Sequence, residues 1–179
     1  MTAPAQVFAI VGPSGAGKDT LIAGALQARP DLRLVRRVIT RPTDAGGEDF
    51  EGVTEAEFAA RTARGDFALT WGAHGLHYAI PRAEVDHPGT VLFNGSRAAL
   101  PAALEVFPNL RVILITARVD VLAQRLAQRG RETEAEIRDR LDRAEFDLPE
   151  GFLPTTVLNE GPVEAGVERL LAALQPLKA

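Results

Sequence analysis

The sequence of 179 residues contains no cysteine. Disulfide bonds, thiolate catalysis, zinc ribbons and iron–sulfur clusters are therefore excluded together, and the absence fits a reducing compartment. No apolar run approaches the roughly 18 residues that span a bilayer, and the first residues, MTAPAQVFAIVG, lack the basic segment of a secretory signal. We therefore expect a soluble, cytoplasmic protein that binds no membrane.

Lysine is almost absent, since Lys18 and Lys178 are the only two among 20 basic residues. With 24 acidic residues the formal net charge is −4, which argues against nucleic-acid binding because affinity for a phosphate backbone needs a basic surface. A preference for arginine codons is the simpler explanation of the overall ratio. A local cluster at positions 125, 129, 131, 138, 140 and 143 is different, because guanidinium groups bind phosphate in two-pronged fashion.

Hydrophobic residues make up 46% of the chain and charged residues 25%, which is typical of one globular domain. Apolar runs predict strands at residues 6–11, 91–94 and 111–116, and two further strands are predicted at 34–39 and 155–158. Helical spacing predicts helices at 19–28, 54–64 and 162–174, and a charged helix from 133 to about 146. Capping-box spacing at Thr54–Glu57 and Thr133–Glu136 marks the start of two of these helices. This alternation favours an α/β fold with a mainly parallel five-stranded sheet and helices on both faces.

The segment 40–80 interrupts the alternation. Its Pro and Gly residues predict a loop over 40–52, followed by the helix at 54–64. Two strands at 67–73 and 76–80 flank a His-Gly turn, as in a short hairpin. We interpret this insertion as a subdomain that binds the acceptor of a reaction.

The loop after the first strand defines the reaction class. Residues 12–20 read GPSGAGKDT, which places Gly-x4-Gly-Lys between an apolar strand and a helix. The glycines let successive N–H groups surround a phosphate at the positive end of the helix, and Lys18 adds a charge for the β- and γ-phosphates. The loop therefore predicts ATP binding through Gly12, Pro13, Ser14, Gly15, Ala16, Gly17, Lys18, Asp19 and Thr20.

Asp19 stands where a Ser or Thr usually supplies a hydroxyl to Mg²⁺. An aspartate can hold the metal directly or through water, or it can stabilise the first helical turn through the helix dipole. The strands at 91–94, 111–116 and 155–158 end without the carboxylate that often completes such a metal site. Asp19 is accordingly our candidate magnesium ligand, with stabilisation of the first helical turn as the open alternative.

The arginine cluster is predicted to be a lid. Arg125 and Arg129 stand four residues apart on one helical face, and Arg140 lies on the charged helix that follows. A lid folding over ATP would bring Arg129 and Arg140 to the transferring phosphoryl group, whose charge spreads over its equatorial oxygens. Ion pairs along a solvated helix, such as Glu136 with Arg140, are the alternative.

Four segments carry a family resemblance, namely GPSGAGKDT, ITRPTDAGGE at 39–48, GDFALTWGAHGLHYAIP at 65–81 and RLAQRGRETEAEIRDRL at 125–141. In order and spacing they resemble guanylate kinase. Within that superfamily, the Lys-Asp pair, W-x-A-x-G-L-x-Y at 71–78 and NGSRAALP at 94–101 resemble the ribose 1,5-bisphosphate phosphokinase family.

The resemblance implies a guanylate kinase-like P-loop NTPase fold, with a core at 1–39 and 81–179, an acceptor-binding insertion at about 40–80 and a helical lid at about 125–141. It implies transfer of a phosphoryl group from ATP, with Mg²⁺, to ribose 1,5-bisphosphate, releasing ADP and 5-phosphoribosyl 1-diphosphate (PRPP). It also places Asn159 near the adenine of ATP, Arg125 at the ATP site and Tyr78 at an acceptor phosphate, although hairpin packing explains Tyr78 equally well. Trp71 on the same hairpin is either a cover for the sugar or a core residue.

Departures from guanylate kinase favour the sugar substrate. The tyrosine after that family's Gly-Glu stretch is Phe50 here, and the glutamate that recognises guanine falls at Leu69. Without that carboxylate, two guanine N–H donors lose their acceptor, which costs about 1–3 kcal/mol each. The remaining candidates for a small phosphorylated sugar are Arg37, Arg41, Glu48, Tyr78, Asn94, Ser96 and Arg97.

Two rival functions remain open from the sequence. One is a nucleoside monophosphate kinase of the guanylate type. The other is a catalytically silent, guanylate kinase-like module that binds proteins. Intact Lys18 and the lid arginines favour an enzyme, whose oligomeric state the sequence leaves open.

Overall fold

The computed structural model describes residues 6–13, 15–42, 49–86, 88–128, 133, 135–136 and 153–175. The chain divides into two compact units. We name Met1–Ala9 with Arg29–Arg111 the hairpin unit, and Ile10–Ala28 with Val112–Ala179 the phosphate-loop unit.

A five-stranded parallel sheet has the order β2-β7-β1-β8-β9. Its strands are β1 (Gln6–Val11), β2 (Arg33–Leu34), β7 (Thr90–Asn94), β8 (Arg111–Thr116) and β9 (Thr155–Leu158). The central strand β1 is buried from Val7 to Val11, as expected for an apolar run covered on both faces. The predicted α/β fold with a parallel sheet is confirmed.

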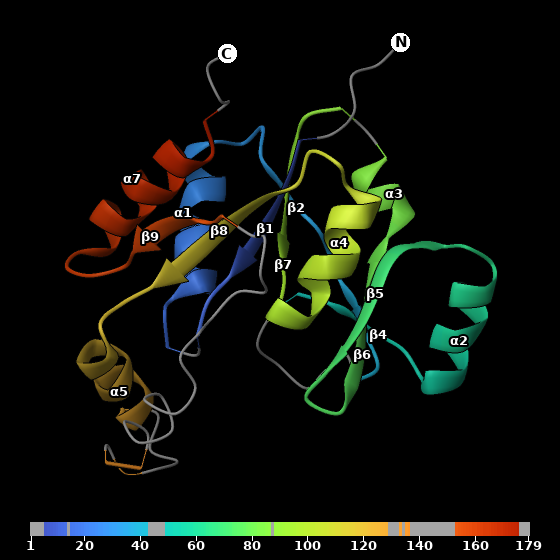
Figure 1. Cartoon of the computed structure of the whole chain (residues 1–179), viewed down its shortest axis with the longest axis horizontal. Coiled ribbons are helices and arrows are strands. Elements are labelled where there is room, and N and C mark those ends of the chain that lie inside the picture. Colours follow the sequence, from blue (N-terminus) through green and yellow to red (C-terminus); the bar gives the residue numbers. More distant parts are fainter. Residues whose placement is uncertain are drawn as a thin grey trace. The chain divides into compact units, whose positions relative to one another are not determined.

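In the phosphate-loop unit, helix α1 (Lys18–Ala28) packs along α7 (Val163–Ala173), seen as the blue and red helices of Figure 1. Leu21, Ile22 and Ala25 form the buried side of α1. Gly24 of α1 lies against Val167, where any Cβ would overlap the valine side chain, so the two helices approach closely. Both helices were predicted from their apolar spacing, to within one residue at each end.

The hairpin unit contains a second, four-stranded sheet with the order β4-β3-β6-β5. Its strands are β3 (Val38–Ile39), β4 (Glu51–Gly52), β5 (Phe67–Ala73) and β6 (Leu76–Pro81). The helices of this unit are α2 (Glu55–Ala63), α3 (Arg82–Val85), a 3₁₀ turn at Arg97–Ala99 and α4 (Leu100–Val106).

The predicted single strand at 34–39 is wrong. Residues 33–34 form β2, which pairs with β7, whereas residues 38–39 form β3, which pairs with β4 and β6. Val35 after β2 is buried, and Arg36 and Arg37 follow it where the backbone passes from one sheet to the other. The predicted loop over 40–52 is likewise wrong at its end, because Glu51 and Gly52 pair in parallel with β3.

The predicted hairpin is confirmed as β5 and β6. Its turn residues, His74 and Gly75, have φ angles of 53° and 73°, which match the type I′ turn that suits the twist of a two-residue hairpin. Alternate residues of β5, namely Phe67, Leu69 and Trp71, are buried. This alternation is the period of two expected for a strand with one covered face.

Helix α2 begins at the cap that the sequence predicted, since Thr54 Oγ1 accepts a hydrogen bond from the Glu57 N–H at 3.1 Å. Its buried Phe58 packs on Phe67 of β5, with ring centroids 5.1 Å apart. The apolar surface buried in this contact stabilises the packing of α2 on the sheet.

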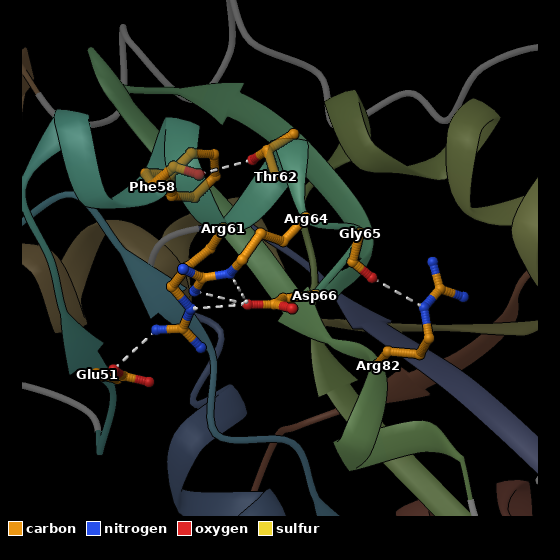
Figure 2. A network of polar contacts seen from close by, with 8 residues as sticks. All are labelled: Glu51, Phe58, Arg61, Thr62, Arg64, Gly65, Asp66 and Arg82. Atoms are coloured by element: carbon orange, nitrogen blue, oxygen red, sulfur yellow. Dashed lines mark hydrogen bonds and ion pairs between the residues drawn. The ribbon is translucent and has the colours of Figure 1, made fainter.

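Polar contacts surround the end of α2 (Figure 2). Arg61 donates to Glu51 of β4 at 2.8 Å, Arg64 pairs with Asp66 at 2.9 Å, and Arg82 donates to the Gly65 carbonyl at 3.2 Å. An exposed ion pair such as Arg64 with Asp66 contributes about 0–1 kcal/mol, so it orients the helix end more than it stabilises it. Among the described residues, none of the helices is long and apolar enough to cross a membrane.

Candidate active site

The loop between β1 and α1 has the geometry of a phosphate-binding loop. Gly12 lies where a Cβ would overlap the carbonyl oxygen of Ile115 on β8, so the loop starts at a close backbone approach that only glycine permits. Gly15 and Gly17 have φ angles of +85° and +83°, which other residues rarely adopt. The resulting turn brings the loop to the N-terminus of α1, where the helix dipole favours an anion.

Lys18 is the first residue of α1 and reaches back over the loop. Its Nζ donates to the Gly12 carbonyl at 2.7 Å. The ammonium group therefore already lies over the loop that is predicted to hold the phosphates.

Arg125, on α5 (Val119–Ala127), contacts this loop through its carbonyl groups. Its Nη1 donates to Gly15 at 3.1 Å and to Ala16 at 3.3 Å, and its Nη2 donates to the main-chain carbonyl of Asn159 at 2.7 Å. These bonds join the phosphate loop, α5 and the end of β9 in one network.

Asn159 follows β9 and is 6% exposed. Its Nδ2 donates to the Ala16 carbonyl at 2.8 Å, and its N–H donates to Thr116 of β8 at 2.8 Å. The side chain of the residue predicted near adenine thus lies against the phosphate loop.

Sequence reasoning missed Gly166, which lies on α7 beside Asn159. A Cβ at this position would come within 2.7 Å of the Asn159 Oδ1 and 2.8 Å of a Leu21 methyl carbon. A glycine inside an otherwise regular helix costs about 1 kcal/mol relative to alanine, and this cost is the signal that points to a packing role.

Asp19 and Thr20, in the first turn of α1, are both exposed. They supply a carboxylate and a hydroxyl, the oxygen donors that Mg²⁺ prefers. Within the described ranges, no three His, Cys, Asp or Glu side chains form a group able to hold a metal.

Several acceptor candidates meet in the hairpin unit. The guanidinium of Arg37, which is 7% exposed, donates to the Asn94 carbonyl at 2.8 Å. Its Cζ lies 5.1 Å from the ring centre of Tyr78, and Tyr78 stacks on Trp71. A buried cation thus joins the end of β7 to the hairpin.

The other described candidates are Arg41, Ser96 and Arg97. Arg41 lies over the ring of buried Phe50, with 4.7 Å between its Cζ and the ring centre. Ser96 Oγ is buried and, among the described residues, has no hydrogen-bond partner. Arg97 is exposed at the start of the 3₁₀ turn. The unsatisfied hydroxyl of Ser96 is a group that a polar ligand would satisfy.

Ser14, Glu48, Arg129 and Arg140 lie outside the described residues, as does most of the predicted lid at 125–141. Within that segment, the Glu136 N–H donates to Thr133 Oγ1 at 3.2 Å, which matches the predicted cap. The lid function of Arg129 and Arg140 stays a prediction.

Trp71, which the sequence suggested either as a cover for a sugar or as core, is 7% exposed and packs between Tyr78 and Phe93. The ring centroids of Trp71 and Phe93 are 6.4 Å apart. These contacts favour the core interpretation for Trp71.

A comparison with protein-family models gave no match. Among curated proteins, a ribose 1,5-bisphosphate phosphokinase of Ruegeria sp. is 51% identical over 184 residues, covering 99% of this chain and 97% of the relative. A ribose 1,5-bisphosphate phosphokinase of Agrobacterium fabrum is 46% identical over 175 residues, covering 94% of this chain and 96% of the relative.

Among solved structures, guanylate kinase from Anaplasma phagocytophilum is similar in fold, with a TM-score of 0.65 and 18% identity over 98% of this chain and 89% of that one. The likeness confirms the expected guanylate kinase-like fold. The identity to the curated relatives, over nearly their whole length, shows the family: this chain belongs to the ribose 1,5-bisphosphate phosphokinases.

Proposed function

We propose that this protein transfers the γ-phosphoryl group of ATP to the 1-phosphate of ribose 1,5-bisphosphate, giving ADP and PRPP. The observation that carries the proposal is the phosphate loop, with Lys18 Nζ lying 2.7 Å from the Gly12 carbonyl at the N-terminus of α1. The family of the chain supports the choice of acceptor, because its curated relatives are named for ribose 1,5-bisphosphate.

On the ATP side, the backbone N–H groups of the loop bind the α- and β-phosphates. Lys18 exchanges its bond to Gly12 for one to the β- and γ-phosphates and neutralises charge there. The site thus works by alignment and charge neutralisation rather than by covalent catalysis.

Magnesium fits the oxygen donors at the start of α1. Asp19 and Thr20 would hold the ion directly or through water, together with phosphate oxygens of ATP. When bound, Mg²⁺ supplies charge neutralisation at the phosphates.

On the acceptor side, the nucleophile is a phosphate oxygen that already carries negative charge at pH 7. Its oxygen forms a bond to the γ-phosphorus while the bond from that phosphorus to the β-phosphate oxygen breaks, and ADP leaves with the electron pair. Because the nucleophile has no proton to remove, no general base is needed. Arg37 and Arg41 would bind the acceptor's phosphates, with Glu48 on a sugar hydroxyl.

The hairpin unit supports a sugar phosphate better than guanine. Leu69, at the position of the guanine-reading glutamate, is 4% exposed and offers no hydrogen-bond acceptor from its side chain. Arg37, Tyr78 and the buried Ser96 hydroxyl offer donors that suit phosphate and hydroxyl oxygens. A nucleoside monophosphate kinase is therefore the less favoured function, and a protein-binding module less still.

The test is a coupled assay of ADP release with ribose 1,5-bisphosphate or GMP as acceptor, with PRPP identified by ³¹P NMR. We expect turnover with the sugar bisphosphate, and turnover with GMP alone would contradict the acceptor. Lys18→Ala should lower kcat by at least about 100-fold, whereas Lys178→Ala, the other lysine, should retain activity. We further propose that the enzyme acts in the cytoplasm on small molecules alone.

A further inference from the structure

The carbonyl oxygen of Ala16, inside the phosphate loop, accepts two hydrogen bonds. One comes from Asn159 Nδ2 at 2.8 Å and the other from Arg125 Nη1 at 3.3 Å. Arg125 also donates to the main-chain carbonyl of Asn159 at 2.7 Å, so the three residues form a closed set. We name Arg125, Asn159 and the Ala16 carbonyl the carbonyl clamp.

The clamp determines where the next N–H group points. In a trans peptide the C=O and N–H vectors are antiparallel, because the unit is planar. The Ala16 carbonyl is held toward Arg125 and Asn159, so the N–H of Gly17 is directed away from these two side chains. That N–H is one of the loop donors that surround a phosphate.

Packing keeps Asn159 in this role. The side chain is buried, and its amide lies between Gly17 of the loop and Gly166 of α7, where a Cβ at either glycine would collide with it. Its main chain is bonded to Thr116 of β8 at 2.8 Å. The amide therefore has one well-defined position. A side chain that holds a backbone peptide in place must itself be fixed in this way.

We propose that Arg125 and Asn159 are positioning residues, which hold the Ala16–Gly17 peptide in the orientation that directs its N–H to the bound nucleotide's β-phosphate. The inference rests on the proposed function, since it concerns how the same loop binds ATP. It differs from the sequence-based expectation that Arg125 touches ATP itself. Both side chains act through the backbone.

The two roles predict different patterns of nucleotide affinity. A direct contact between Arg125 and the γ-phosphate would make Arg125→Ala weaken ATP far more than ADP. If Arg125 instead holds a donor to the β-phosphate, Arg125→Ala lowers the affinity for ATP and for ADP by the same factor. The affinity for AMP stays unchanged, because AMP has no β-phosphate. Calorimetric titration with ATP, ADP and AMP, each with magnesium, separates these cases.

We expect Arg125→Ala and Asn159→Asp each to lower the affinities for ATP and ADP by about tenfold. The ratio of the ATP affinity to the ADP affinity should stay within about threefold of its value in the parent protein. An ionised carboxylate cannot donate to the Ala16 carbonyl, while its size is that of the asparagine amide. Because both residues act on one carbonyl, the affinity loss of the double variant should be clearly smaller than the product of the two single fold-losses. Arg125→Lys should restore little, since one ammonium cannot reproduce a fork that reaches three carbonyls.

Arg169→Ala is the matched control. Arg169 lies on α7 and donates to the Leu158 carbonyl at 2.8 Å and the Glu160 carbonyl at 3.4 Å, on either side of Asn159 in the chain. Because these bonds go to the end of β9 and to Glu160, and not to the Ala16 carbonyl, the variant should leave ADP affinity unchanged even if it lowers stability. Thermal unfolding of each variant identifies any loss of fold. The ¹⁵N–¹H chemical shift of Gly17 reports directly on the environment of its N–H, and the change on adding ADP should be smaller in the clamp variants.

A preferential loss of ATP over ADP by tenfold or more, unchanged ADP affinity in Asn159→Asp, or full additivity of the double variant would each overturn the clamp. A parent protein that binds neither ATP nor ADP would overturn the proposed function, and the clamp with it. If the parent binds both nucleotides and the variants bind them equally well, the clamp is wrong and the proposed function stands.

Discussion

Trp71 and Tyr78 stack face to face across the β5–β6 hairpin, with ring centroids 5.4 Å apart and ring planes 6° from parallel. They are the only tryptophan and the only tyrosine of the chain. The Arg37 guanidinium lies on Tyr78, 5.1 Å from its ring centre. A cation and two aromatic rings thus form one stack in the unit that carries the acceptor candidates.

Tyr78→Phe separates the two roles that the sequence left open for Tyr78. Phenylalanine keeps the ring that stacks on Trp71 and removes only the hydroxyl, so stability should change by less than about 1 kcal/mol. We expect affinity for ribose 1,5-bisphosphate to fall by about tenfold while ATP affinity stays unchanged. The emission of Trp71, the single tryptophan, measures the titration. Unchanged acceptor affinity would leave Tyr78 with hairpin packing as its only role.

Arg37→Gln should raise the KM for the sugar bisphosphate by at least about tenfold and leave the KM for ATP within about twofold. The physical reason is the loss of a buried charge suited to phosphate, together with its bond to the Asn94 carbonyl. Stability should also fall by about 1–3 kcal/mol. Arg33→Ala is the control, since that side chain is half exposed and lies 3.8 Å from Glu84. Steady-state kinetics with both substrates varied provide the measurement, and an equal rise in both KM values would argue against an acceptor role.

Leu69→Glu should not convert the enzyme into a guanylate kinase. The side chain at this position is 4% exposed on the covered face of β5, so a carboxylate there loses its hydration. We expect a loss of roughly 2–5 kcal/mol in the free energy of unfolding and no turnover of GMP. Leu69→Met, which preserves volume, should cost less than about 1.5 kcal/mol. GMP turnover by a stable Leu69→Glu variant would show that this position alone selects the acceptor.

Gly12→Ala should destabilise the protein by about 1–3 kcal/mol, because its Cβ overlaps the Ile115 carbonyl and the start of the loop must move from β8. Gly72→Ala serves as the comparison, since the nearest atom to its Cβ is the Leu76 carbonyl oxygen at 3.8 Å. That change should stay within about 0.5 kcal/mol. Urea unfolding measures both, and equal stability of the two variants would contradict the close approach at Gly12.

The elements that followed from the sequence are those whose signal is local. Residues 6–11 and 12–20 join a buried apolar run to a glycine loop and Lys18, and each of these features depends only on neighbours in the chain. The Thr54 cap and the His74–Gly75 turn were predictable for the same reason, since their hydrogen bonds and backbone angles close within a few residues.

Nonlocal features were not predictable. The division of 34–39 between two sheets depends on which distant strand each half pairs with, since Leu34 pairs with β7 and Val38–Ile39 with β6. Glu51 and Gly52 form a strand only because β3 supplies a parallel partner.

By itself the sequence determined the glycine loop with Lys18 between a strand and a helix, and the α/β order of elements, because these depend on residue type and spacing. That Leu69 stands at the position of a guanine-reading carboxylate followed only from the resemblance to guanylate kinase. The tertiary structure alone decided that Arg125 and Asn159 both donate to Ala16, more than a hundred positions away in the chain. These hydrogen bonds form only when β9 and α5 are folded against the loop. Nothing in the sequence around the two donor residues indicates which carbonyl group each will bind.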